Sequence, residues 1–526
     1  MKPLLIALAF VTASTIAHAA SGPVVKLDTG AIRGVTDEGV ESFKGIPYAA
    51  PPVGPLRWRP PQSAAHWSGI RDATAYGHDC MQARAPGEKE GTTPSEDCLF
   101  LNVWRPAGTP RHKLPVMVWI HGGGYVVGTN AAPLYSGAAF ARDGVIFVNM
   151  NYRLGRLGFF AFPALTAEHP GEPKGNYGYL DQIAALRWVQ RNIGAFGGDP
   201  DNVTLAGESA GGESVLMLAG SPMAKGLFER AIVESGGGRN ALLGRDLLSQ
   251  DLPGRPSAEK IGVAFAHAQG IVGDGPTALA RLRALSADRI NAGLTMVSLL
   301  LGGLDTFSGP IEDGRIVTGP PSAALATGRG SIVPIIIGSN DADLGIGFAK
   351  SKDAAFAAFG DRKADARAAY DPDGTLDLAA LNTRIGMDRV MTEPARYIAR
   401  MVAGEGQSSY LYRFAYVADS QHGKPIEGAE HASEIPYVFD TINVLLGDTL
   451  AARDAAAARA MHGYWVNFAK RGTPDGAGLP IWPAYATGRD TLMTFAADGT
   501  ASSGDDPWKT RLDLAEALAG EQAVRR

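Results

Sequence analysis

Ser209 lies in the run Gly207-Glu208-Ser209-Ala210-Gly211, which has the Gly-x-Ser-x-Gly pattern of a nucleophilic serine. Strand-like residues 203–206 precede the run, and a helical pattern follows it. A serine on so tight a strand-to-helix turn is pushed clear of the backbone, and glycines flank it because a Cβ atom there would clash across the turn. The N–H groups that open the helix point toward whatever the serine attacks. The pattern predicts nucleophilic catalysis by Ser209.

A serine nucleophile needs a base, and the base needs an acid that orients it. The downstream histidines are His267, His422, His431 and His462. His267 falls in a helical stretch, His422 lies in a polar loop, and His462 sits among apolar residues of a predicted helix, which favours a packed side chain. His431 lies in a loop after a strand segment, where the base of such an enzyme is expected. We therefore predict His431 as the base.

Two aspartates could orient this histidine. Asp341 and Asp343 both follow the apolar strand predicted at residues 333–337. A carboxylate at the end of that strand can reach the same crevice as the serine. Spacing alone leaves both open, and either could instead serve as a turn former.

A glycine run could bind the negative oxygen that forms when the serine attacks a carbonyl group. His121-Gly122-Gly123-Gly124 directly follows the predicted strand 116–120. Three successive glycines allow backbone N–H groups to approach a substrate oxygen without obstruction. A phosphate-binding loop is the competing interpretation, but the sequence completes neither of the usual phosphate-loop patterns.

The elements that would position these residues form an alternating pattern. Near-continuous apolar strands separated by helices indicate a mostly parallel sheet that is covered on both faces, hence an α/β fold. Residues 240–330 have weak helical periodicity, and we interpret them as an insertion over the site. The chain has no internal repeat or low-complexity linker, so residues 21–526 are expected to form one domain. The predicted strands are 99–104, 116–120, 145–149, 203–206, 231–233, 333–337 and 410–414, the helices are 179–193 and 455–470, and residues 23–34 form a hairpin.

The first 20 residues have the features of a secretory signal peptide. Lys2 precedes an apolar run, residues 4–11, and Ala17-His18-Ala19 provides a cleavage site. The mature protein would then be secreted or periplasmic. We find no other apolar stretch long enough to cross a bilayer, so no stable membrane anchor is expected.

Composition excludes some classes of partner and suggests a role for the two cysteines. The net charge of −5 arises from mixed acids and bases without a basic tract, which argues against nucleic acid and anionic membranes as partners. Cys80 and Cys98 are the two cysteines, and in an exported protein such a pair is expected to form a disulfide. A metal site would need two more ligands, and His78 is the obvious one nearby.

At this point the chain resembles the type-B carboxylesterase and cholinesterase family, an α/β-hydrolase group. The resemblance spans nearly all of the mature sequence. The motifs that carry it lie at residues 43–49, 96–103, 121–124, 151–153, 176–178, 196–200 and 207–211.

The resemblance implies a role for each candidate. Ser209 would be the nucleophile and His431 the general base, and the oxyanion hole would consist of N–H groups of Gly123, Gly124 and Ala210. Cys80–Cys98 matches the first disulfide of the family. The family usually has Asp-Glu-Gly at the acid, whereas this chain has Ala342-Asp343-Leu344, which puts the shorter Asp343 in the acid's place.

The expected activity is hydrolysis of carboxylic esters through an acyl-enzyme, with no cofactor or metal, by a monomer or small homo-oligomer. The open alternatives are an amidase, carbamate hydrolase or lactonase, and a non-catalytic adhesion or binding protein on the same fold. An aromatic ring would bind the quaternary ammonium group of a choline ester by cation–π attraction. Residues 81–97 contain no aromatic side chain, so weak turnover of choline esters is expected. Arg239 could bind an acidic group of the substrate. The alternative is that it is an ordinary surface arginine.

Overall fold

The computed structural model describes residues 22–83, 91–108, 111–239, 246–301, 305–421, 428–486 and 488–524. The predicted signal peptide, His422 and residues 84–90 of the loop between the two cysteines lie outside these residues. No helix in the described ranges is both long and apolar enough to span a membrane.

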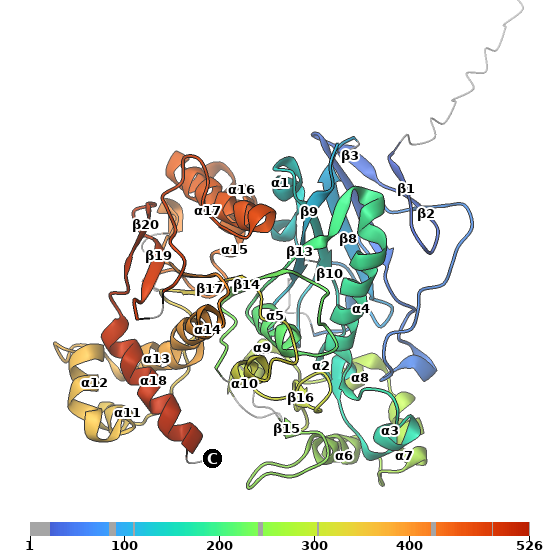
Figure 1. Ribbon diagram of the computed structural model, residues 1–526. Coiled ribbons are helices and arrows are strands. Elements are labelled where there is room, and N and C mark those ends of the chain that lie inside the picture. Colours follow the sequence, from blue (N-terminus) through green and yellow to red (C-terminus); the bar gives the residue numbers. More distant parts are fainter. Residues whose placement is uncertain are drawn as a thin grey trace, which may run out of the picture.

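An 11-stranded sheet runs through the molecule (Figure 1). Its order is β20-β19-β18-β17-β14-β13-β9-β10-β8-β4-β3. The strands from β19 to β10 in this order are parallel, and antiparallel strands flank them on both sides. The strands are β3 (Val35–Asp37), β4 (Val40–Pro47), β8 (Phe100–Pro106), β9 (Leu114–Ile120), β10 (Ile146–Met150), β13 (Gly198–Glu208), β14 (Arg230–Glu234), β17 (Ile335–Asn340), β18 (Ser409–Phe414), β19 (Thr491–Phe495) and β20 (Ala501–Asp505). The predicted mostly parallel sheet is thus confirmed.

Helices cover both faces of this sheet, which explains why its central strands are apolar along their length. In β9, Val116 and Val118 belong to the core on one face, whereas Met117 and Trp119 belong to the core on the other. Helices α4 (Tyr177–Asn192), α5 (Ala210–Gly220) and α14 (Glu393–Gly404) contribute to the first core. Helices α1 (Ala138–Arg142), α15 (Ile435–Val438) and α17 (Ala452–Arg471) contribute to the second. Both predicted helices are present, with bounds shifted by up to three residues.

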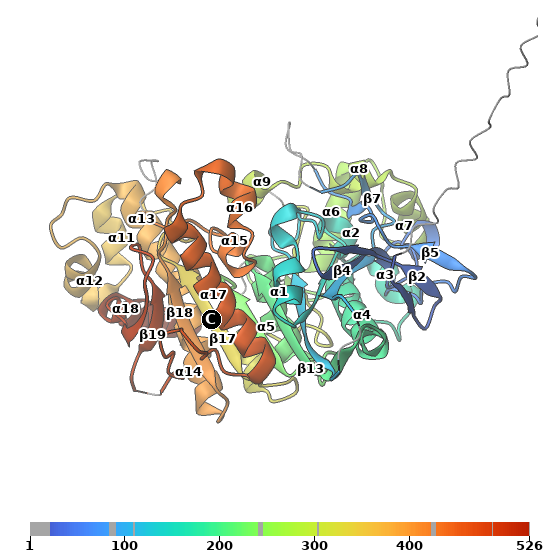
Figure 2. The ribbon, with the colours of Figure 1, turned by 90° about the horizontal axis from the view of Figure 1, so that it is seen from above.

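The predicted insertion consists of short elements between β14 and β17. One of them, α9, lies over the glycine run, because a Cβ atom at Gly124 would be 2.6 Å from Leu299 and 3.1 Å from the sulfur of Met296. Figure 2 shows α9 and α16 (Ile442–Leu446) along one edge of the molecule. The elements are β15 (Asp246–Leu247), α6 (Ala258–Ala268), α7 (Pro276–Arg283), α8 (Ala287–Asn291), α9 (Met296–Leu301), β16 (Ile311–Glu312) and α10 (Pro321–Ala326).

The remaining elements surround this framework. The predicted N-terminal hairpin is present as antiparallel β1 and β2. The remaining strands and helices are β1 (Val24–Lys26), β2 (Ala31–Arg33), β5 (Ile70–Asp72), β6 (Asp79–Cys80), β7 (Pro94–Ser95), β11 (Phe159–Phe160), β12 (Gly175–Asn176), α2 (Gly155–Gly158), α3 (Pro163–Glu168), α11 (Lys352–Ala357), α12 (Lys363–Tyr370), α13 (Leu378–Met387) and α18 (Lys509–Val524).

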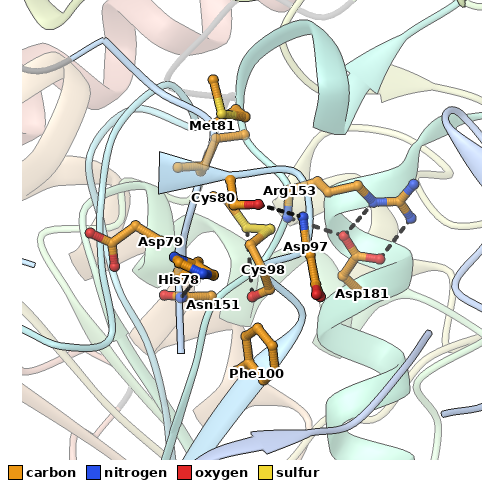
Figure 3. Close-up of a disulfide and its surroundings, with 12 residues drawn as sticks. His78, Asp79, Cys80, Met81, Asp97, Cys98, Phe100, Asn151, Arg153 and Asp181 are labelled. Atoms are coloured by element: carbon orange, nitrogen blue, oxygen red, sulfur yellow. Dashed lines mark hydrogen bonds and ion pairs between the residues drawn. A yellow bond between two sulfur atoms is a disulfide. The ribbon is translucent and has the colours of Figure 1, made fainter. Parts of the chain in front are cut away.

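Cys80 and Cys98 form the predicted disulfide, with their Cα atoms 4.9 Å apart (Figure 3). The bond ties β6 to the residues that lead into β8. Both cysteines are buried. A disulfide sulfur is not a thiolate ligand, so the alternative of a metal site at these cysteines is wrong.

Candidate active site

Ser209 occupies the junction between β13 and α5 in a strained backbone conformation, with φ of 55° and ψ of −124°. Its own N–H donates to the carbonyl oxygen of Glu234 at 2.8 Å, which holds the turn against the neighbouring strand. The flanking glycines are required by the close approach of other backbone. A Cβ atom at Gly207 would lie 2.6 Å from the carbonyl carbon of Gly211, and one at Gly211 would lie 2.1 Å from the carbonyl oxygen of Ile120. Strain of this kind in a non-glycine residue is typical of functional sites.

His431 lies in the segment that connects β18 to α15. A bridge between Ala342 and Glu430 fixes this segment beside the end of β17. The His431 Nε2 atom is 2.9 Å from Ser209 Oγ, and its Nδ1 atom is 2.6 Å from Asp343 Oδ1. The structure therefore joins the predicted serine, histidine and Asp343 in one hydrogen-bonded series.

Asp343, rather than Asp341, faces this histidine. The buried Asp343 carboxylate also accepts hydrogen bonds from Ser235 Oγ at 2.7 Å and from the N–H groups of Asn340 at 2.9 Å and Leu344 at 2.7 Å. Burial by itself raises the pKa of Asp343, but the hydrogen bond and charge of His431, together with the hydrogen bonds from Ser235 and Asn340, lower it overall.

Asp341 has a different contact. Its Oδ1 atom accepts from the N–H of Ala429 at 2.6 Å, two residues before His431. Burial raises the pKa of Asp341. Asp341 thus holds the histidine segment in place but has no contact with the imidazole among the described interactions.

The glycine run lies directly against the serine, since a Cβ atom at Gly122 would be 3.1 Å from Ser209 Cβ. Gly123 and Gly124 have φ values of 97° and 60°, in the left-handed region that favours glycine. Within the described part of the chain, the N–H groups of Gly123, Gly124 and Ala210 donate to no protein acceptor. Three backbone donors near one serine can stabilise a developing oxyanion.

Three buried glutamates next to this series escaped the sequence prediction. Glu208 Oε1 lies 3.2 Å from His431 Nε2, Glu234 accepts from Trp465 Nε1 at 2.7 Å, and Glu434 accepts from Asn340 Nδ2 at 2.5 Å. Burial raises the pKa of Glu208 to about 8, that of Glu434 to about 7, and that of Glu234 well above its usual range. One signal was present in the sequence, because Glu208 is a charged residue at the end of an otherwise buried apolar strand.

The glutamates affect the imidazole. Burial by itself lowers the pKa of His431, but the charges of Glu208 and Asp343, with the hydrogen bond to Asp343, raise it to about 10. The protonation state of Glu208 thus sets how readily His431 accepts a proton from Ser209.

A cavity of about 260 Å³ opens beside the glycine run and the residue after His431. Its lining combines polar and apolar residues. The lining includes Asp79, Gln82, Gly123, Thr129, Tyr135 and Ala432.

The other sequence candidates lie elsewhere or have structural partners. His462 is buried in α17, with Nδ1 2.7 Å from the Val438 carbonyl oxygen, which confirms its predicted packing role. His267 lies on α6. Arg239 donates from Nε to Glu393 Oε2 at 2.9 Å and stacks over Tyr397. Arg239 is thus engaged within the protein, which favours a structural role over binding of an acidic substrate group.

Comparisons with known proteins agree with this geometry. The sequence profile described as "Carboxylesterase family" matches residues 21–512. The chain is 35% identical over 496 residues to fumonisin B1 esterase of Sphingopyxis macrogoltabida, covering 90% of this chain and 87% of that protein. It is 34% identical over 501 residues to para-nitrobenzyl esterase of Bacillus subtilis (strain 168), covering 92% and 96%.

A solved structure of PNB esterase superposes with a TM-score of 0.78 at 32% identity, covering 94% of this chain and 99% of that one. The likeness confirms the α/β-hydrolase fold that the motifs implied. A family profile over almost the whole chain, together with esterases of similar length, leaves one assignment. The chain belongs to the carboxylesterase family and is a carboxylic ester hydrolase.

Proposed function

We propose that this protein hydrolyses carboxylic esters in two steps through a covalent acyl-enzyme at Ser209. His431 takes the proton from Ser209 Oγ as the oxygen attacks the ester carbonyl carbon. The carbonyl oxygen becomes an oxyanion that accepts hydrogen bonds from the N–H groups of Gly123, Gly124 and Ala210. The observation that carries the proposal is the continuous hydrogen-bonded series from Ser209 through His431 to Asp343.

The second half of the cycle uses the same groups. Imidazolium His431 donates its proton to the departing alkoxide, so that the alcohol leaves and the acyl group stays on Ser209. His431 then deprotonates a water molecule, which attacks the acyl carbon. The bond from this carbon to Ser209 Oγ breaks, Oγ takes the proton back from His431, and the carboxylic acid is released. Asp343 stays ionised throughout and stabilises the imidazolium, in accord with its lowered pKa.

We also propose which side of the active site binds the alcohol group of the ester. The leaving oxygen must receive its proton from His431, and the cavity of about 260 Å³ is lined by Gly123 and by Ala432, the residue after His431. The alcohol would therefore occupy this cavity. No part of the mechanism requires a cofactor. We further propose that residues 21–526 act as one exported domain after loss of residues 1–20.

The test is turnover of an ester panel by the wild type, Ser209→Ala and a matched Ser221→Ala variant at the other end of α5. The panel contains p-nitrophenyl esters of graded acyl length, with p-nitroanilides and carbamates of the same acids. We expect turnover of esters above anilides, at least about a 1000-fold loss in Ser209→Ala, and little change in Ser221→Ala. Preferred turnover of anilides would favour the amidase alternative, and a folded wild type without any turnover would favour a binding protein.

A further inference from the structure

Gln82 makes a two-point contact with the backbone of Gly128. The Gly128 N–H donates to Gln82 Oε1 at 2.8 Å, and Gln82 Nε2 donates to the Gly128 carbonyl oxygen at 2.7 Å. Nε2 also donates to the Cys80 carbonyl oxygen at 3.0 Å. Because both the donor and the acceptor of Gly128 are held by one planar amide, this residue cannot rotate without breaking a hydrogen bond.

Gly128 in turn supports the glycine run. It has a φ of 139°, and a Cβ atom there would lie 2.1 Å from His121 Nδ1 and 2.9 Å from the Gly122 carbonyl oxygen. The adjacent Val127 N–H donates to the Gly123 carbonyl oxygen at 3.1 Å. The backbone of Gly128 is therefore in direct contact with the residues that lead into the proposed oxyanion hole.

The other end of this contact is anchored firmly. Gln82 lies two residues after Cys80, whose disulfide to Cys98 ties it to the sheet (Figure 3). On the other side of Cys80, Asp79 Oδ1 accepts from Thr129 Oγ1 at 2.6 Å. Residues on both sides of Cys80 thus hold the consecutive residues Gly128 and Thr129.

We propose that Gln82 is a positioning residue that fixes the loop 121–128 so that the N–H groups of Gly123 and Gly124 point at the oxyanion. The inference rests on the proposed function and adds a residue outside the series Ser209–His431–Asp343. Oxyanion donors act only within a narrow range of distance, so a shift of about 1 Å is costly to the transition state. The ground-state ester does not depend on this alignment to the same extent.

The test compares Gln82→Met, which keeps the side-chain volume but removes all three hydrogen bonds, with Gln62→Met at an exposed glutamine. Gln82 also lines the cavity proposed for the alcohol group, so the test uses esters of one acid with alcohols of graded size. In Gln82→Met we expect kcat to fall about 10- to 100-fold for every ester, with KM changed by less than about threefold for the smallest alcohol. The affinity for a trifluoromethyl ketone, which forms an oxyanion on the serine, should fall by the same factor as kcat. Gln62→Met should match the wild type in both measurements.

A second readout does not depend on activity. Hydrogen–deuterium exchange of peptides that cover residues 121–130 should increase in Gln82→Met and remain unchanged in Gln62→Met. Gln82→Glu, which keeps the acceptor for Gly128 but loses the donor, replaces Gln82→Met if that variant does not fold. Unchanged exchange in this segment, or an active wild type whose kcat and inhibitor affinity survive the substitution, overturns the inference. Absence of wild-type ester turnover would instead count against the proposed function, while the exchange measurement still decides the role of Gln82.

Discussion

At the residue scale, the clearest distinction is between two aspartates two positions apart. Within the described part of the chain, the Asp343 carboxylate has four polar contacts, and all come from donors: His431, Ser235 and the N–H groups of Asn340 and Leu344. An asparagine would turn its NH₂ group toward at least one of these donors, whichever way its amide is oriented. Asp341 accepts from Ala429, and an asparagine oxygen can accept the same bond.

Asp343→Asn is therefore expected to lower kcat by up to about 10⁴-fold with little change in substrate binding. Asp341→Asn should lose far less, because its role is to hold the segment that carries His431. Steady-state kinetics of the two variants side by side are the measurement. A larger loss in Asp341→Asn would reverse the assignment of the acid.

Glu208 should control the pH dependence of the reaction. Its carboxylate lies 3.2 Å from His431 Nε2 and favours the imidazolium, so it raises the pKa of His431. Glu208→Gln removes the charge, and the pKa of His431 should fall. Since the neutral imidazole is the active base, the acid limb of kcat/KM should move to lower pH.

The profile of kcat/KM against pH tests this for the wild type and Glu208→Gln. Glu430→Gln is a suitable control, because it removes a carboxylate from the residue next to His431 that has no side-chain contact with the imidazole in the described interactions. An acid limb that stays at the same pH in Glu208→Gln would show that its carboxylate does not act on His431.

At the scale of the elements, a substitution in the glycine run tests whether its N–H groups stabilise the oxyanion. A Cβ atom at Gly123 would lie 2.1 Å from the Val127 carbonyl oxygen, so Gly123→Ala must displace the loop. We expect kcat to fall about 10²- to 10³-fold, the cost of losing one oxyanion donor. Gly226→Ala is the control, because Gly226 also has a positive φ of 76° but an added Cβ meets nothing within 4 Å. A kcat for Gly123→Ala equal to that of the control would reduce the run to a tight turn.

The elements next to the serine were the most predictable from sequence. Strand β13, the turn and α5 have a continuous apolar pattern interrupted by glycines that steric contacts require, so local rules agree with the fold. The parallel strands β9, β14, β17 and β18 are likewise apolar over most of their length. The sequence did not predict the short helices of the insertion one by one. Helices α8, α9 and α10 have five or six residues each, which is too few turns for a periodic signal.

The buried carboxylates show where sequence reasoning ended. Glu208 and Glu234 end the paired strands β13 and β14, whereas Glu434 comes from a distant part of the chain, and nothing in the local pattern shows that the three meet. Each looks like an ordinary acid until the fold removes it from water and raises its pKa. Similarly, Asp341 and Asp343 could not be separated by spacing, since the distinction depends on which side chain the turn after β17 directs toward His431.

At the scale of the whole molecule, the disulfide should add stability. Cys80 and Cys98 are 18 residues apart, and closing a loop of this length stabilises the folded chain by about 3 kcal/mol in the chain-entropy model. Cys80→Ser/Cys98→Ser should therefore lower Tm by about 3 °C, since the unfolding entropy of a chain this long is large. Differential scanning calorimetry of the oxidised wild type and the double variant measures this. A Tm that does not change would mean that the bond adds no net stability.

In the proposed mechanism, the acyl group of the substrate becomes bonded to Ser209 Oγ during turnover. The most direct test mixes the enzyme with p-nitrophenyl acetate, quenches the reaction in acid within milliseconds, and locates the adduct by peptide mass spectrometry. We expect one acetyl group on the peptide that contains Ser209, and none on the same peptide from Ser209→Ala. Turnover without any acyl adduct, or an adduct at another residue that forms and decays at the turnover rate, would contradict it.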